Sequence, residues 1–123
     1  TISRGRTNTP LQALVTLNDP VYIETAQSLA RRIIAEGGDS IEAQAIYGFR
    51  LVLARPPHAA ERTRIIALYE RVVEQYAADP RSATDIATMP IGPLSEGVDV
   101  VSAAAWTVVG NVLLNLDETL AKR

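Results

Sequence analysis

The chain has 123 residues, no cysteine and a formal net charge of -2, from 12 basic and 14 acidic side chains. The absence of cysteine excludes disulfides, thiolate catalysis and cysteine-ligated metals from this segment. The balance of charge argues against a basic surface for nucleic acid or anionic membranes. Because 47% of the residues are apolar and few are aromatic, one core of Leu, Ile, Val and Ala is expected.

The length and composition predict one helical domain over residues 1–123. The sequence opens at Thr1 without a methionine. We therefore expect it to be a C-terminal fragment of a longer protein.

The first chemically specific stretch is the corner at residues 8–19. Thr9 and Gln12 have the spacing of a capping box, with Pro10 at the first helical position, and predict a short apolar helix over residues 10–18. The next helix is predicted to start at once, at Pro20. The polar residues of this corner are candidates either for a capping network, which we favour, or for a binding patch: Asn8, Thr9, Gln12, Asn18 and Asp19.

Helical periodicity continues in four longer segments, each bounded by proline or glycine. They predict helices at 20–36, 40–54, 59–78 and 99–116. Residues 82–88 can form one or two further helical turns, with Ser82 and Asp85 as a box-like pair, and 89–97 reads as a loop. No stretch alternates with the period of a strand. The predicted fold class is therefore all-α, a compact bundle of about five helices.

The last of these helices is predicted to be central. No charge occurs from Val100 to Leu114, so this helix is apolar on nearly every side and must be wrapped by others. The run is short and interrupted by polar residues, which argues against a membrane span. We interpret it as a buried core helix with Trp106 at its middle.

No catalytic, cofactor or metal site is predicted within the chain. His58 is the single histidine and follows Pro56-Pro57, where it is placed to cap a helix with Glu61 three residues on. Asp117 and Glu118 are adjacent, so on a helix they point about 100 degrees apart and cannot act on one substrate atom. A helix-turn-helix is disfavoured, because its recognition helix would begin with apolar residues 21–23. Arginines 31 and 32 are interpreted as part of a solvated face.

Three segments resemble a known family. They are TNTPLQALVTLNDPVYIETAQSLARRI at 7–33, FRLVLARPPHAAE at 49–61 and AAWTVVGNVLLNLDE at 104–118. In this order they resemble the C-terminal domain of unknown function of large planctomycete-type secreted proteins, which often also carry a planctomycete-type cytochrome c domain. The resemblance implies a secreted, periplasmic or cell-surface-linked location. It also implies that any haem lies in a separate upstream domain, and it supplies no catalytic residues.

Two functional classes follow. The first is a non-catalytic helical module that packs against the other domains of a larger, redox-associated protein or docks a protein partner. The alternative is the C-terminal part of an extracellular enzyme, with polysaccharide as a candidate substrate and its active site upstream of Thr1. Neither class involves nucleic acid.

Overall fold

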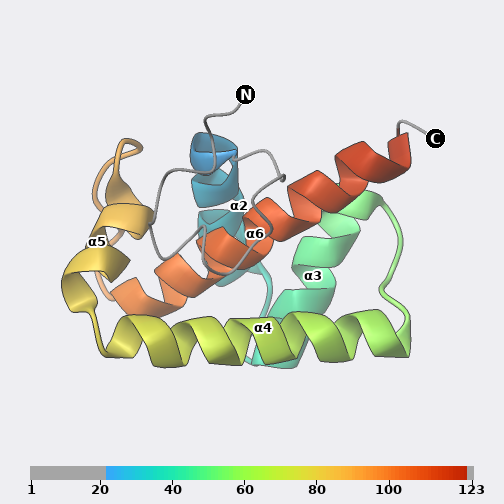
Figure 1. Ribbon diagram of the computed structural model, residues 1–123, viewed down its shortest axis with the longest axis horizontal. Coiled ribbons are helices and arrows are strands. Elements are labelled where there is room, and N and C mark those ends of the chain that lie inside the picture. The colour runs from blue at the N-terminus through green and yellow to red at the C-terminus, as the bar shows by residue number, and fades with distance from the viewer. Residues whose placement is uncertain (1–21, 122–123) are drawn as a thin grey trace, which may run out of the picture.

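The computed structural model describes residues 22–121, which form five helices and contain no strand (Figure 1). The all-α prediction is confirmed. The predicted helix at residues 10–18 and the corner at residues 8–19 lie outside the described part of the chain. The five helices are α2 (Ile23–Glu36), α3 (Ile41–Leu53), α4 (Ala59–Ala77), α5 (Pro80–Thr88) and α6 (Val100–Ala121).

Helix α6 forms the centre of the bundle, as predicted. It crosses the middle of the molecule and contacts each of the other four helices (Figure 1). Its residues 103–111 are all buried, and Trp106 is 0% exposed. Small residues permit the close contacts, because a Cβ atom at Gly110 would lie 3.2 Å from Cδ2 of Leu29 on α2. The helix continues five residues past the predicted end at Leu116, since neither glycine nor proline interrupts it there.

Helix α6 is also long and apolar enough to cross a membrane, with a mean hydropathy of 1.4 over Val100–Asp117. A core helix has the same composition when other helices surround it. Of this window, 61% is buried inside the bundle. The burial supports the interpretation as a core helix, and the absence of a membrane span stays a prediction.

The ends of α3 follow local sequence signals. Ser40 is the N-cap, and its hydroxyl accepts a hydrogen bond from the amide of Ala43 at 3.0 Å. At the other end Ala54 adopts a left-handed conformation, with φ of 61°, just before the prolines that stop the helix. Both boundaries agree with the prediction to within one residue.

Two other helix starts differ from the prediction. Helix α2 begins at Ile23 rather than Pro20, because Tyr22 has non-helical torsion angles and its amide donates to Oδ1 of Asn111 at 2.7 Å. Helix α5 is a full nine-residue helix starting at Pro80. Its cap is Asp79 rather than Ser82, since the Asp79 carboxylate accepts from the amide and hydroxyl of Ser82 at 3.3 and 2.8 Å.

Two side chains of α2 fasten α5 and the following loop to the bundle. Gln27 is fully buried, and its Nε2 donates to the carbonyls of Ile86 and Met89 at 2.8 Å each. Arg31 donates to backbone carbonyls of α5 and the loop. The acceptors are Pro93 at 3.0 Å, Ala87 at 3.1 Å and Gly92. The interpretation of Arg31 as part of a solvated face is therefore wrong, because the guanidinium satisfies loop carbonyls.

Candidate functional site

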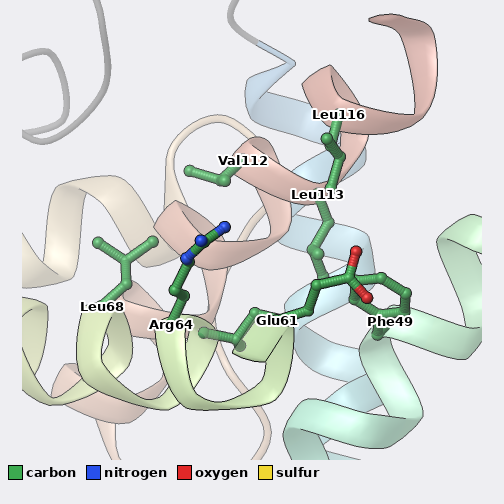
Figure 2. Close-up of a pocket in the computed structure, with 8 residues that line it drawn as sticks. Phe49, Glu61, Arg64, Leu68, Val112, Leu113 and Leu116 are labelled. Carbon is green, nitrogen blue, oxygen red and sulfur yellow. The ribbon is translucent and has the colours of Figure 1, made fainter. Parts of the chain in front are cut away.

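A pocket of about 280 Å³ lies between α4 and α6 (Figure 2). The two helices contribute its walls, and Phe49 of α3 closes one end. Most of the lining is apolar, so the pocket is suited to apolar side chains rather than to polar substrates. The lining residues are Phe49, Glu61, Arg64, Ile65, Leu68, Val112, Leu113 and Leu116. We call this pocket the α4–α6 groove.

A second pocket, of about 350 Å³, lies between α2, α3 and α6. It is more open, and its lining mixes leucines with Thr25, Ser28, Arg32 and Asp117. The guanidinium of Arg32 is already paired with Glu36 at 3.2 Å. The α4–α6 groove is therefore the better-defined apolar site of the two.

The spacing of residues on α4 forms one wall of the groove. Glu61, Ile65 and Leu68 recur at helical spacing and so share one face of the helix with Arg64. On α6, Val112 and Leu116 are half-buried and four residues apart, while Leu113 is buried at 2% exposure. Two apolar helical faces thus meet along the groove.

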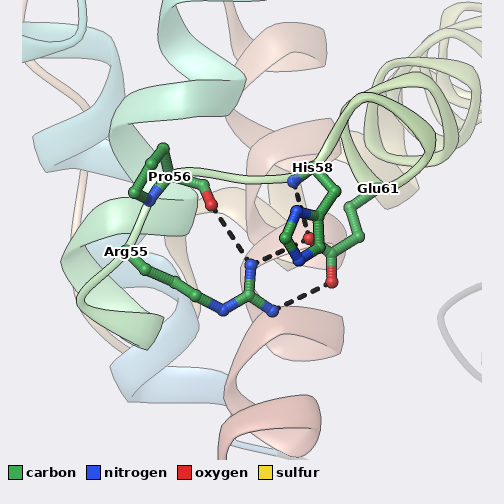
Figure 3. A network of polar contacts seen from close by, with 4 residues as sticks. All are labelled: Arg55, Pro56, His58 and Glu61. Atoms are coloured by element: carbon green, nitrogen blue, oxygen red, sulfur yellow. Dashed lines mark hydrogen bonds and ion pairs between the residues drawn. The ribbon is translucent and has the colours of Figure 1, made fainter.

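An ion pair between Arg55, which follows α3, and Glu61 of α4 connects the two helices at their corner (Figure 3). Arg55 Nη1 and Nη2 each donate to one carboxylate oxygen of Glu61 at 3.0 Å. Glu61 Oε1 also accepts from the amide of His58 at 2.8 Å, and the Arg55 guanidinium lies 4.9 Å from the centre of the buried Phe49 ring. His58 is the N-cap of α4, as predicted.

These contacts determine the ionisation of Glu61. The Arg55 guanidinium, followed by the amide of His58, lowers the pKa of Glu61 from 4.5 to about 2. Glu61 is therefore a paired carboxylate at neutral pH and has no proton to donate. Glu61 and Arg64 have the spacing of a surface pair on one helix, but Arg55 binds this carboxylate instead.

Arg64 is the positively charged side chain among the residues that line the groove. Its side chain is exposed and makes no ion pair or hydrogen bond with any residue in the described part of the chain. Figure 2 shows it reaching from α4 toward Val112, while the Glu61 carboxylate turns toward Phe49. The neighbouring Arg62 is instead paired with Glu42 at 3.5 Å. The groove therefore combines apolar walls with one positive charge that no side chain among residues 22–117 neutralises.

The arrangement favours binding over chemistry. Among residues 22–117 no three His, Asp or Glu side chains gather where they could hold a metal ion. The absence of a cofactor or metal from the whole chain remains a prediction, because residues 1–21 are not described.

The structure leaves the predicted site residues untested. Asn8, Thr9, Gln12, Asn18 and Asp19 all lie outside the described residues. Asp117 lies at the second pocket rather than at the groove. Sequence reasoning missed Arg64 and Leu68 as groove residues. Their helical spacing with Ile65 was visible, but periodicity does not tell which part of an apolar face its neighbours leave uncovered.

Comparison with known proteins gives one family. A family model described as PSD1, protein of unknown function (DUF1553), matches residues 1–69, which is 69 of the 123 residues. The match includes α2, α3 and the first part of α4. No curated protein and no solved structure matches the chain.

Proposed function

Because the chain belongs to the PSD1 family of proteins of unknown function (DUF1553), we propose that it is a non-catalytic helical docking module of a larger protein. The α4–α6 groove is its docking face, and the other domains of the same protein are its first partners. By the resemblance of its three segments, the larger protein is secreted and redox-associated. Any haem is held by a separate cytochrome c domain.

The observation that carries this proposal is the groove itself. Leu68, Val112 and Leu116 are half-buried apolar side chains that line one concave surface. Covering such side chains by a partner removes apolar surface from water, which is the main favourable term in association. The nearby carboxylate of Glu61 is held by Arg55 and His58, so it stabilises the corner and is not poised for proton transfer.

Thiol labelling tests the proposal, because the natural chain contains no cysteine. Leu68→Cys places a thiol in the groove, and Ala67→Cys places one on the exposed side of the same helix. Both thiols should react with a maleimide in the 123-residue chain. In the longer protein, mass spectrometry should find position 68 protected and position 67 still labelled.

Equal labelling of position 68 in the two proteins would show that the groove does not dock. Circular dichroism of each variant establishes that the helices are retained. Catalytic turnover by the 123-residue chain alone would contradict the non-catalytic part of the proposal.

A further inference from the structure

We propose that the α4–α6 groove receives an amphipathic helix that carries a carboxylate opposite Arg64. This inference rests on the proposed docking function and adds the chemistry of the partner. It follows from the shape of the groove, from the way its charges are paired and from the position of Arg64.

The shape of the groove favours a helix as its occupant. Both long walls are helices, and the α4 wall from Glu61 to Leu68 spans about two turns, roughly 10 Å. A third helix can place apolar side chains at i, i+3 or i+4, and i+7 between such walls. Two or three leucine-sized anchors would match the exposed parts of Leu68, Val112 and Leu116.

The charges select an acidic partner. Glu61 is neutralised by Arg55 at two 3.0 Å contacts, and Arg62 pairs with Glu42 at 3.5 Å. Arg64 is the charged side chain of the groove that no described residue pairs. A carboxylate on the docked helix would supply its partner, whereas a lysine there would place two positive charges together.

The position of Arg64 determines how much an ion pair with the carboxylate of the docked helix contributes to affinity. The guanidinium lies at the solvent edge of the groove, where an ion pair adds little affinity while water has access. A docked helix excludes part of that water and fixes the two side chains in one orientation. Arg64 is therefore expected to determine which helix binds and in which direction, while the apolar walls supply the attraction.

A charge exchange tests this inference. The probes are two fluorescent designed helices of equal length, with leucines at i, i+3 and i+7, which differ by one Glu or Lys beside the leucine stripe. Fluorescence anisotropy with the 123-residue chain should show the Glu peptide binding about fivefold more tightly than the Lys peptide. Arg64→Glu should reverse this preference.

Arg81→Glu is the matched control, because Arg81 is exposed on α5 and the same change in net charge occurs away from the groove. It should keep the preference of the parent. The inference is overturned if neither peptide binds, or if Arg64→Glu and Arg81→Glu behave alike. Self-association of the chain that competes with the Glu peptide would assign the groove to a second copy instead.

The outcomes separate the two proposals. Protection of the thiol at position 68 in the longer protein, without a charge preference, would retain the docking function and refute the acidic helix. Free reactivity of that thiol in the longer protein would refute the docking function, whatever the peptides do.

Discussion

The indole nitrogen of Trp106 donates to Oε1 of Gln44 at 3.1 Å, across 62 positions of sequence. The indole is 0% exposed, and the centroid of its ring lies 4.5 Å from the centroid of the Tyr69 ring. Gln44 also donates to the carbonyl of Gly38 at 2.9 Å. One carboxamide thus joins the start of α3 to the centre of α6.

Replacing Gln44 should expose the importance of this contact. Gln44→Leu leaves the buried indole N–H without its acceptor, so the free energy of unfolding should fall by about 1 to 3 kcal/mol. Urea denaturation followed by tryptophan emission measures the change. Gln75→Leu, a half-buried glutamine of α4, is the matched control and should have the smaller effect.

The emission of Trp106 tests the position of α6 directly. Because the indole is fully buried, the native spectrum should be blue-shifted and acrylamide should quench it poorly. Quenching as efficient as that of free indole would mean that α6 is not in the core.

Acid should remove the stabilisation that Glu61 provides. Its pKa in the folded chain is about 2, below the 4.5 of an unperturbed glutamate. Since the folded value is the lower one, the contribution is complete above pH 4.5 and is lost as the pH falls toward 2. Glu61→Gln should therefore melt at a lower temperature than the parent above pH 4.5, and the difference should shrink toward pH 2. Glu70→Gln, an exposed position on the same helix, serves as the comparison.

A methyl group at Gly48 should disturb the contact between α2 and α3. An added Cβ atom would lie 2.7 Å from Cδ1 of Ile33, a fully buried side chain. We expect Gly48→Ala to cost about 1 to 3 kcal/mol through overpacking, despite the better helix propensity of alanine. Ile33→Val removes Cδ1, so the double variant should be more stable than the sum of the single effects predicts. Strict additivity in chemical denaturation would contradict this packing.

Arg31 should control the loop that precedes α6. Arg31→Met keeps the aliphatic stem but removes the hydrogen bonds to the carbonyls of Ala87, Gly92 and Pro93. Hydrogen exchange by mass spectrometry should show faster exchange in residues 89–97. The neighbouring Arg32→Met breaks exposed contacts with Glu36 and the hydroxyl of Tyr47, away from this loop, and should leave the loop unchanged.

The corner at residues 8–19 remains the sharpest sequence-based prediction. If Thr9 and Asn18 cap helices, Thr9→Ala and Asn18→Ala should each cost on the order of 1 kcal/mol. Chemical denaturation beside the parent measures this loss. Unchanged midpoints for both variants, together with weaker binding of a native partner, would make the corner a binding patch.

Local signals predicted most of the helical boundaries. Ser40 and the prolines after Ala54 define α3, and His58 with Glu61 defines the start of α4, because each signal acts within one turn. The length of helix α5 was underestimated, since its fully buried residues are Ala83 and Ala87, with only Ile86 as a larger apolar side chain beside them. Alanines give little hydrophobic periodicity, and their burial depends on α6 lying against them.

Contacts between distant segments were not predictable in the same way. Gln27 and Arg31 look like ordinary polar positions of a surface helix, yet they bind carbonyls about 60 residues away. The groove depends on which apolar residues of α4 and α6 stay uncovered after packing. Both features depend on how the helices are placed against one another. The helical periodicity of the sequence does not determine that placement.

The order of the helices along the chain also bears on how the protein is made. Helix α6, residues 100–121, contacts each of the other four described helices and is the last of the five helices to leave the ribosome. During synthesis, the apolar faces of α2 to α5 stay exposed until α6 has been made, because the side chains of α6 fill the space between them. Closure of the core is thus coupled to the synthesis of α6. A nascent chain stalled before Val100 would expose apolar surface that is prone to aggregation. It would depend on chaperones to stay soluble, rather than form a partly folded domain.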